Sequence, residues 1–207
     1  MPPVLKIVQA GDPVLRRRAR PLSVDELASP RLRELITAMR DTMRDAPGVG
    51  LAAPQIGESL QLVVIEDPPE LQAPLTPEQR AERGREPVAF HVLANPELVV
   101  EEAEPVEFFE GCLSVHDHLM IVPRARRVRV TGLDQDGQPV VKVASGWYAR
   151  ILQHEIDHLH GVLCVDRMLS RSFMPMAQYQ RFWRSRSIAE VRAELGISDA
   201  TRGTSGP

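Results

Sequence analysis

Residues 147–160 constrain the fold of this chain more than any other stretch, because they combine a helical repeat with a cluster of ionisable side chains. The apolar positions of the repeat are Ile151, Leu152, Ile156 and Leu159. Positions with this spacing share one face of an α-helix, and such a face has to be covered by other parts of the protein. Gly161 follows the repeat and is expected to end the helix. The sequence therefore predicts an amphipathic helix against which the rest of the chain packs.

The same stretch contains the string HEIDH, in which His154 and His158 are four positions apart. Side chains at that spacing lie on the same side of a helix, so both imidazoles can bind one metal ion. Glu155 stands beside the first histidine, where a carboxylate can act as general base without ligating the metal, as in H-E-x-x-H hydrolases. Three of the six histidines fall in this stretch, which favours a metal site over a helix with surface histidines and acids. His160 lies off this row and is expected to be structural or exposed, and Asp157 is expected to support the site or cap the helix.

Two imidazoles do not hold a catalytic metal tightly, so a third ligand is needed. A downstream ligand would follow the metzincin pattern, in which Gly161 fits and Cys164 occupies the ligand position. The upstream alternative is Cys112, which follows a predicted strand and has a glycine beside it. Cys164 stands among apolar residues, where a free cysteine usually serves as a small hydrophobic side chain. Local chemistry therefore favours Cys112, and a thiolate with two imidazoles leaves a coordination position open.

The remaining segments alternate irregularly between strand and helix patterns. Helices are expected at 30–45 and 187–195, strands at 60–66, 88–94, 97–100, 105–109, 126–133 and 142–144, an accessible loop at 46–57, and a surface excursion at 67–87 with a helical turn after Thr76. Arginine alternates with valine in 126–133, which is typical of the solvated face of a half-buried sheet. The fold class predicted is α+β, with mainly antiparallel sheets packed around a central H-E-x-x-H helix.

Composition excludes several classes of partner. The net charge of −3 gives no strong electrostatic case for a nucleic-acid or membrane partner. No apolar run approaches the roughly 20 residues that span a bilayer. The first residues lack the layout of a secretory signal, and the two cysteines do not form a disulfide framework, so a reducing, cytoplasmic location is expected.

Three separated segments, GVGLAAPQIG (48–57), EGCLSV (110–115) and QHEIDHLHG (153–161), resemble in order and spacing the three signature motifs of peptide deformylases. The resemblance covers most of residues 4–169. It implies a catalytic domain over 1–170. The residue pattern beyond it predicts a partly helical C-terminal extension over 171–197, and the Gly, Ser, Thr and Pro content predicts a disordered tail over 198–207. The resemblance further implies removal of the formyl group from the N-terminal formylmethionine of newly synthesised polypeptides.

The resemblance also implies a role for each matching residue. Cys112, His154 and His158 would bind one divalent metal ion, with Fe²⁺ expected in vivo and Zn²⁺, Ni²⁺ or Co²⁺ also compatible. Glu155 would be the general acid/base for water activated by the ion. The side-chain amide of Gln55 and the backbone N–H of Leu113 would stabilise the oxyanion. On residue type alone, Gln55 is better explained as a loop side chain that holds its own backbone.

Substrate contacts follow from the same comparison. Val49 and Gly50 would pair with an extended N-formylmethionyl peptide, as a strand added to a sheet edge. Trp147 would narrow the methionine pocket or else be core. Glu110 matches a family acid and is placed at the substrate site. Arg124 matches the family base with which that acid pairs.

Some residues depart from the family pattern or leave alternatives open. After EGCLSV many deformylases continue with proline, whereas this chain has His116, Asp117, His118 and Leu119; surface positions are expected for the two histidines. Arg181, Arg184 and Arg186 either dock on the ribosome, the family's site of action, or form a solvated basic segment. The rival functions are an H-E-x-x-H metallopeptidase that uses Cys164 or a downstream acid and a binding protein that has lost catalysis.

Overall fold

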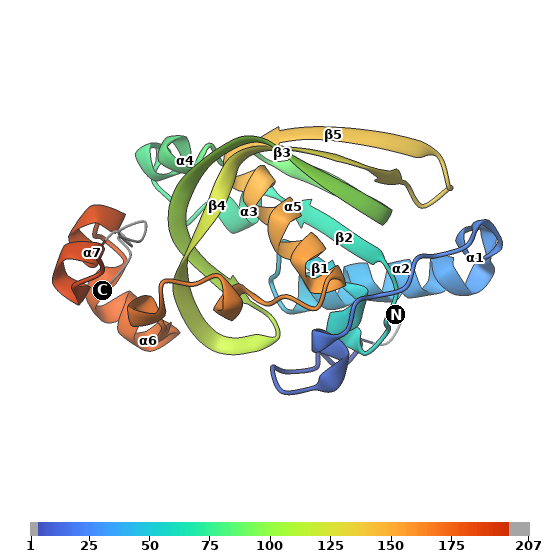
Figure 1. Ribbon diagram of the computed structural model, residues 1–207, viewed down its shortest axis with the longest axis horizontal. Helices are drawn as coiled ribbons and strands as arrows, with labels where there is room; N and C mark the ends of the chain where they lie inside the picture. The colour runs from blue at the N-terminus through green and yellow to red at the C-terminus, as the bar shows by residue number, and fades with distance from the viewer. Residues whose placement is uncertain (1–3, 199–207) are drawn as a thin grey trace, which may run out of the picture.

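The computed structural model, which describes residues 4–198, contains one sheet of six strands (Figure 1). Its order is β1-β2-β3-β4-β5, and β6 pairs separately with β4. The strands are β1 Gly50–Ala52, β2 Leu62–Asp67, β3 Val88–Cys112, β4 Val115–Leu133, β5 Pro139–Ser145 and β6 Met174–Pro175. All neighbouring strands run antiparallel. The predicted mixture of helices and antiparallel sheet is therefore confirmed.

The strands predicted at 88–94, 97–100 and 105–109 are one continuous strand, β3. Its pairing with β4 shifts register between Ala94 and Glu97, and again between Glu102 and Pro105. Prolines at 96 and 105 explain these shifts, because proline has no N–H to donate to the ladder. Bulges bend a strand, and Figure 1 shows the β3–β4 ribbon as an arc beside α5. The arc returns the tip of the hairpin, which carries Cys112, to the face of that helix.

Helix α5, Gly146–Leu159, is the helix predicted from the apolar repeat. Its four apolar residues are buried and pack in one cluster with side chains of β1 to β5. Gly161 follows the helix with a φ of +75°, and a Cβ there would lie 2.7 Å from the carbonyl oxygen of Arg16. Glycine is required at this position both by its backbone conformation and by the close approach of the N-terminal segment.

Helix α2, Pro30–Asp45, agrees with the predicted 30–45. Ser29 caps it by accepting a hydrogen bond from the N–H of Leu32, and Pro30 takes the first helical position. Its buried face packs against β1 and β2 in a second cluster. The shorter α1, Val24–Ala28, precedes it and begins with a capping box from Ser23 and Glu26.

The prediction of an accessible loop over 46–57 is wrong for its second half. Gly50–Ala52 forms β1 and Ala53–Ile56 forms a 3-10 turn, with Leu51, Ala52 and Ala53 fully buried. Glycine and alanine have little intrinsic strand preference, so the pattern gives no strand signal. The strand forms through its tertiary context, because β2 pairs with it and α5 packs over it.

The excursion and the C-terminal extension carry the remaining helices, which are α3 Pro69–Gln72, α4 Pro77–Arg83, α6 Met176–Gln178, a π-helical turn Tyr179–Trp183 and α7 Ile188–Leu195. Further 3-10 turns are Pro13–Arg16, Cys164–Asp166 and Ser170–Ser172. Thr76 caps α4 where the helical turn is expected, and α7 matches the predicted 187–195. Of the predicted tail, residues 199–207 lie outside the described residues. Between residues 4 and 198, no helix is long and apolar enough to cross a membrane.

Candidate metal centre

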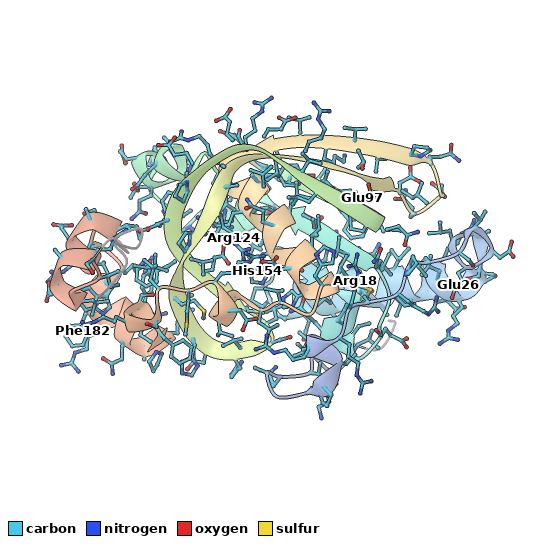
Figure 2. All side chains as sticks on the ribbon, in the orientation of Figure 1. Arg18, Glu26, Glu97, Arg124, His154 and Phe182 are labelled. Atoms are coloured by element: carbon cyan, nitrogen blue, oxygen red, sulfur yellow. The ribbon has the colours of Figure 1, made fainter. Side chains whose placement is uncertain are left out.

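Three ligand atoms from two elements converge beside α5. The Nε2 atoms of His154 and His158 are 3.3 Å apart, and Sγ of Cys112 is 3.4 Å from Nε2 of His158. All three ligand atoms lie within 4.8 Å of one another, and no other cluster of this kind occurs in the described part of the chain. In Figure 2, His154 and Arg124 lie in the interior of the molecule, whereas Glu26 and Phe182 point outward near its two ends.

Local structure explains why these atoms meet. The histidines occupy successive turns of α5, and Cys112 is the last residue of β3. Cys112 pairs with Val115 across a two-residue turn formed by Leu113 and Ser114. The fold therefore brings the hairpin tip to the helix and places the upstream candidate, Cys112, beside the two histidines.

The donor set fits a divalent ion. Metal–ligand bonds of about 2.0–2.3 Å in tetrahedral geometry separate neighbouring ligand atoms by about 3.3–3.6 Å, close to the two shortest separations here. His158 is only 1% exposed, so its ring lies in the protein interior. A soft thiolate with two imidazoles is a set that zinc, iron(II), nickel and cobalt accept.

Glu110 holds His154 from behind. One of its carboxylate oxygens lies 3.0 Å from Nδ1 of His154, and the same group binds the guanidinium groups of Arg124 and Arg150. Burial raises the pKa of Glu110, but the hydrogen bond to His154 and the charge of Arg124 outweigh it and hold the pKa well below its usual range. Burial lowers the pKa of His154, and Glu110 reverses this and raises it to about 9. Contact with Glu110 directs Nδ1 away from the cluster and leaves Nε2 facing the other ligand atoms.

Asp157 supports the site through ion pairs, and the sequence does not identify the partners in these pairs. Its carboxylate binds the guanidinium of Arg124 on β4 and, in bidentate fashion at 2.6 and 2.7 Å, that of Arg167. Arg124 in turn binds Glu110. This buried network ties α5 to β4 on the side of the helix that carries the histidines.

Glu155 lies beside the cluster without being part of it. It is 4% exposed, and burial raises its pKa to about 7, with His154 acting in the opposite direction. Its Oε2 atom has no hydrogen-bond partner among the described residues. A carboxyl group with a pKa near the working pH can accept and return a proton efficiently.

The side-chain amide of Gln55 makes contacts at both of its ends. Its Oε1 accepts a hydrogen bond from the N–H of Ala52, so it does hold its own loop. Its Nε2 points the other way, 3.2 Å from Oγ of Ser114 and 3.7 Å from Sγ of Cys112. The amide N–H group is therefore held at the edge of the ligand cluster.

A cavity of about 710 Å³ opens onto this cluster. Every predicted site residue except His158 lines it: Val49, Gly50, Gln55, Glu110, Cys112, Leu113, Trp147, His154 and Glu155. His158 is buried and does not line the cavity. The segments predicted from three distant parts of the sequence thus share one cavity.

The model of the polypeptide deformylase family matches residues 4–173. This chain belongs to that family. It is 45% identical to peptide deformylase 3 of Streptomyces avermitilis over 194 residues, which covers 94% of this chain and 84% of the relative. The mitochondrial peptide deformylase of Homo sapiens is 45% identical over 172 residues, covering 83% and 71%.

Solved structures agree. A class I type b peptide deformylase from Acinetobacter baumannii, described as bound to Met-Ala-Ser, has a TM-score of 0.72 and 37% identity, covering 81% of this chain and all of that one. The resemblance stated from the sequence motifs is confirmed, and the protein is a hydrolase of the deformylase type.

Three residues of this deformylase site have no signal in the sequence. The side-chain amide of Gln9 donates to the carbonyl of Leu113 and accepts from the N–H of His116, so it bridges the hairpin turn. Arg150 is buried against Glu110 and two backbone carbonyls. Met176, from the C-terminal extension, lines the cavity. Their partners are distant in sequence, so local patterns could not have found them.

Three of the residues that depart from the family pattern, His116, Asp117 and His118, line the cavity. His116 is exposed, as expected, and His118 is half-buried and stacks on Phe173 at 4.7 Å between ring centroids. Neither histidine belongs to the ligand cluster. Trp147 lines the cavity and also packs edge-on against Phe108.

Proposed function

We propose that this deformylase hydrolyses the formyl amide of N-terminal formylmethionine at the Cys112, His154 and His158 centre. The observation that carries the proposal is the convergence of this ligand set and Glu155 on one cavity. Incubation of the metallated protein with formyl-Met-Ala-Ser and acetyl-Met-Ala-Ser tests it. We expect formate from the first peptide and no acetate from the second, and absence of formate would count against the proposal.

Held by Cys112, His154 and His158, a divalent ion would supply Lewis acidity, which lowers the pKa of water towards neutrality. Glu155 accepts a proton from that water and returns it to the departing amine, which is the reason for assigning it as general acid/base. We assign this chemistry to residues 1–170. Iron(II) is proposed as the ion in vivo, and metal analysis after anaerobic purification tests that choice against zinc, nickel and cobalt.

Gln55 and the N–H of Leu113 are proposed to share the negative charge that develops on the formyl oxygen. The support is that Nε2 of Gln55 is held beside Cys112 by contacts at both ends of its amide. Removing one such donor typically costs about 3 kcal/mol, so Gln55→Ala should lower kcat by about a hundredfold or more while retaining the metal. Gln135→Ala, on the exposed hairpin loop, is the matched control, and equal kcat values for the two variants would contradict the assignment.

Val49 and Gly50 are proposed to pair with the extended substrate. β1 is the end strand of the sheet, so its second edge has no strand partner among the described residues. A strand-like peptide added there would pass over the ligand cluster.

Gly50→Ala should therefore lower the catalytic rate strongly, because Gly50 lies against the side chain of Glu155. A Cβ at this position would lie 2.2 Å from Oε1 of Glu155, so the carboxylate has to move. Displacement of a catalytic group by about 1 Å can cost about a hundredfold in rate, and we expect a loss of that order in kcat. Steady-state kinetics with thermal unfolding as a folding check measures it; unchanged kcat would mean that Glu155 is not positioned by this contact.

The C-terminal extension, residues 171–197, is proposed to contact substrate residues that follow formylmethionine. β6 pairs with β4 at His118, and Met176 lines the cavity beside it. We expect Met176→Ala to raise KM for formyl-Met-Ala-Ser and to leave the kinetics of formyl-Met amide unchanged. Phe182→Ala, 47% exposed and away from the cavity, is the control. An equal rise in KM for both substrates would contradict this role.

Docking at the ribosome is proposed for the same extension. Arg181, Arg184 and Arg186 are exposed there, and Arg181 and Arg186 stack on neighbouring aromatic rings. Cosedimentation with ribosomes should weaken when Arg181 and Arg184 are changed to glutamate; unchanged cosedimentation would favour a solvated basic segment. The expected cytoplasmic location stays a prediction.

A further inference from the structure

The two cysteines of the chain, Cys112 and Cys164, are both free thiols and pack in the same cluster. Cys164 begins the 3-10 turn that follows α5, and this turn packs against the ends of β3 and β4. The side chain of Cys112 packs against a buried cluster formed by Cys164, Val115, Met120 and Val122. Cys164 is thus the neighbour of a metal ligand without being part of the ligand cluster.

The two thiols differ in access. Cys112 lines the cavity, so a small molecule that enters the site can reach its sulfur. Cys164 is 1% exposed and does not line the cavity. An oxidant therefore meets Cys112 first, and Cys164 is placed to react with the product formed there. Cys112 is therefore placed as the reactive cysteine and Cys164 as the resolving cysteine.

We propose that Cys112 and Cys164 form a reversible disulfide when a hydroperoxide enters the active site. The disulfide itself depends only on the two thiols, whereas its consequence for catalysis rests on the proposed function. A disulfide sulfur is no longer a thiolate, so its formation removes one of the three ligands and releases the ion.

The chemistry balances with hydrogen peroxide as the oxidant. The Cys112 thiolate attacks one peroxide oxygen; an S–O bond forms, the O–O bond breaks, and hydroxide leaves and takes up a proton as water. This gives a sulfenic acid. Cys164 then attacks Sγ of Cys112, an S–S bond forms, and the S–O bond breaks. The leaving hydroxide takes the thiol proton as a second water, so two thiols are oxidised and one peroxide is reduced.

Attack by Cys164 on the sulfenic acid determines whether the oxidation of Cys112 can be reversed. Without a neighbouring thiol, a sulfenic acid can be oxidised further to sulfinic and sulfonic acids, which ordinary thiols do not reverse. A disulfide is reduced by thiol–disulfide exchange, which restores the ligand. In a reducing compartment such a bond would be transient.

Peroxide titration of the zinc-loaded and metal-free full-length protein tests the proposal, read by intact mass and thiol counting. We expect loss of both thiols, loss of two hydrogens from the mass, and a peptide linking Cys112 to Cys164 in the digest. Zinc should be released, and dithiothreitol should restore both thiols and zinc binding. Cys164→Ser and Cys164→Ala should instead gain oxygen on Cys112 and should not be restored; two variants are used so that poor folding of one leaves the test intact.

Gain of oxygen on Cys112 in the unchanged protein, with Cys164 still a free thiol, would overturn the proposal. A disulfide between two chains without the internal one would also overturn it. These readouts do not depend on deformylation. Formation of the disulfide in a protein that releases no formate would refute the proposed function alone, and normal formate release without the disulfide would refute this inference alone.

Discussion

Glu155→Ala is expected to keep the metal and lose nearly all turnover. The carboxylate lies beside the ligand cluster and is not one of its members. Burial raises its pKa to about 7, which suits a group that accepts and returns a proton. General acid–base catalysis typically contributes about 10²–10⁴-fold, so kcat should fall by that order. Metal content by elemental analysis and kcat for formyl-Met-Ala-Ser are measured on the same preparation.

Glu97→Ala, at an exposed position of β3, is the matched control and should behave as the unchanged protein. Loss of metal from Glu155→Ala would identify Glu155 as a ligand. A kcat within a few-fold of the control would leave the acid/base role without support.

Cys112→Ser should abolish tight metal binding and activity, whereas Cys164→Ser should preserve both. A serine hydroxyl does not ionise near neutral pH, so the first change removes the thiolate that completes the ligand set. Cys164 is buried in an apolar cluster, and its change to serine should cost about 1–3 kcal/mol of stability. Metal affinity, formate release and thermal unfolding measured on both variants separate these effects. The reverse pattern would favour the rival metallopeptidase that uses Cys164.

The longer helices, α2 and α5, and the metal-ligand candidates were predictable because their signals are local. Ser29 and Pro30 mark the start of α2, and the apolar repeat of α5 fixes which of its faces is buried. Cys112 could be preferred over Cys164 from its neighbours, because a polar turn and an apolar run favour different uses of a thiol. The alternation in 126–133 likewise agrees with buried Val128 and Val130 on β4.

The remaining features depend on contacts between distant segments. β1 is a strand because β2 pairs with it, and Gly50 is required because Glu155 lies where its side chain would be. Gln9 acts on residues 104 and 107 positions away. Arg150 can be buried because Glu110 and two backbone carbonyls accept hydrogen bonds from its guanidinium group. A charged residue in a helical repeat is expected to be exposed, so the sequence does not predict this burial.

Formate release measured as a function of bound metal tests the central claim most directly. The metal-free protein is titrated anaerobically with iron(II), and formate from formyl-Met-Ala-Ser is quantified at each step. If Cys112, His154 and His158 form the catalytic centre, the rate should rise linearly and stop rising at one ion per chain. Formate release at full rate without metal, or none at full occupancy, would contradict the account.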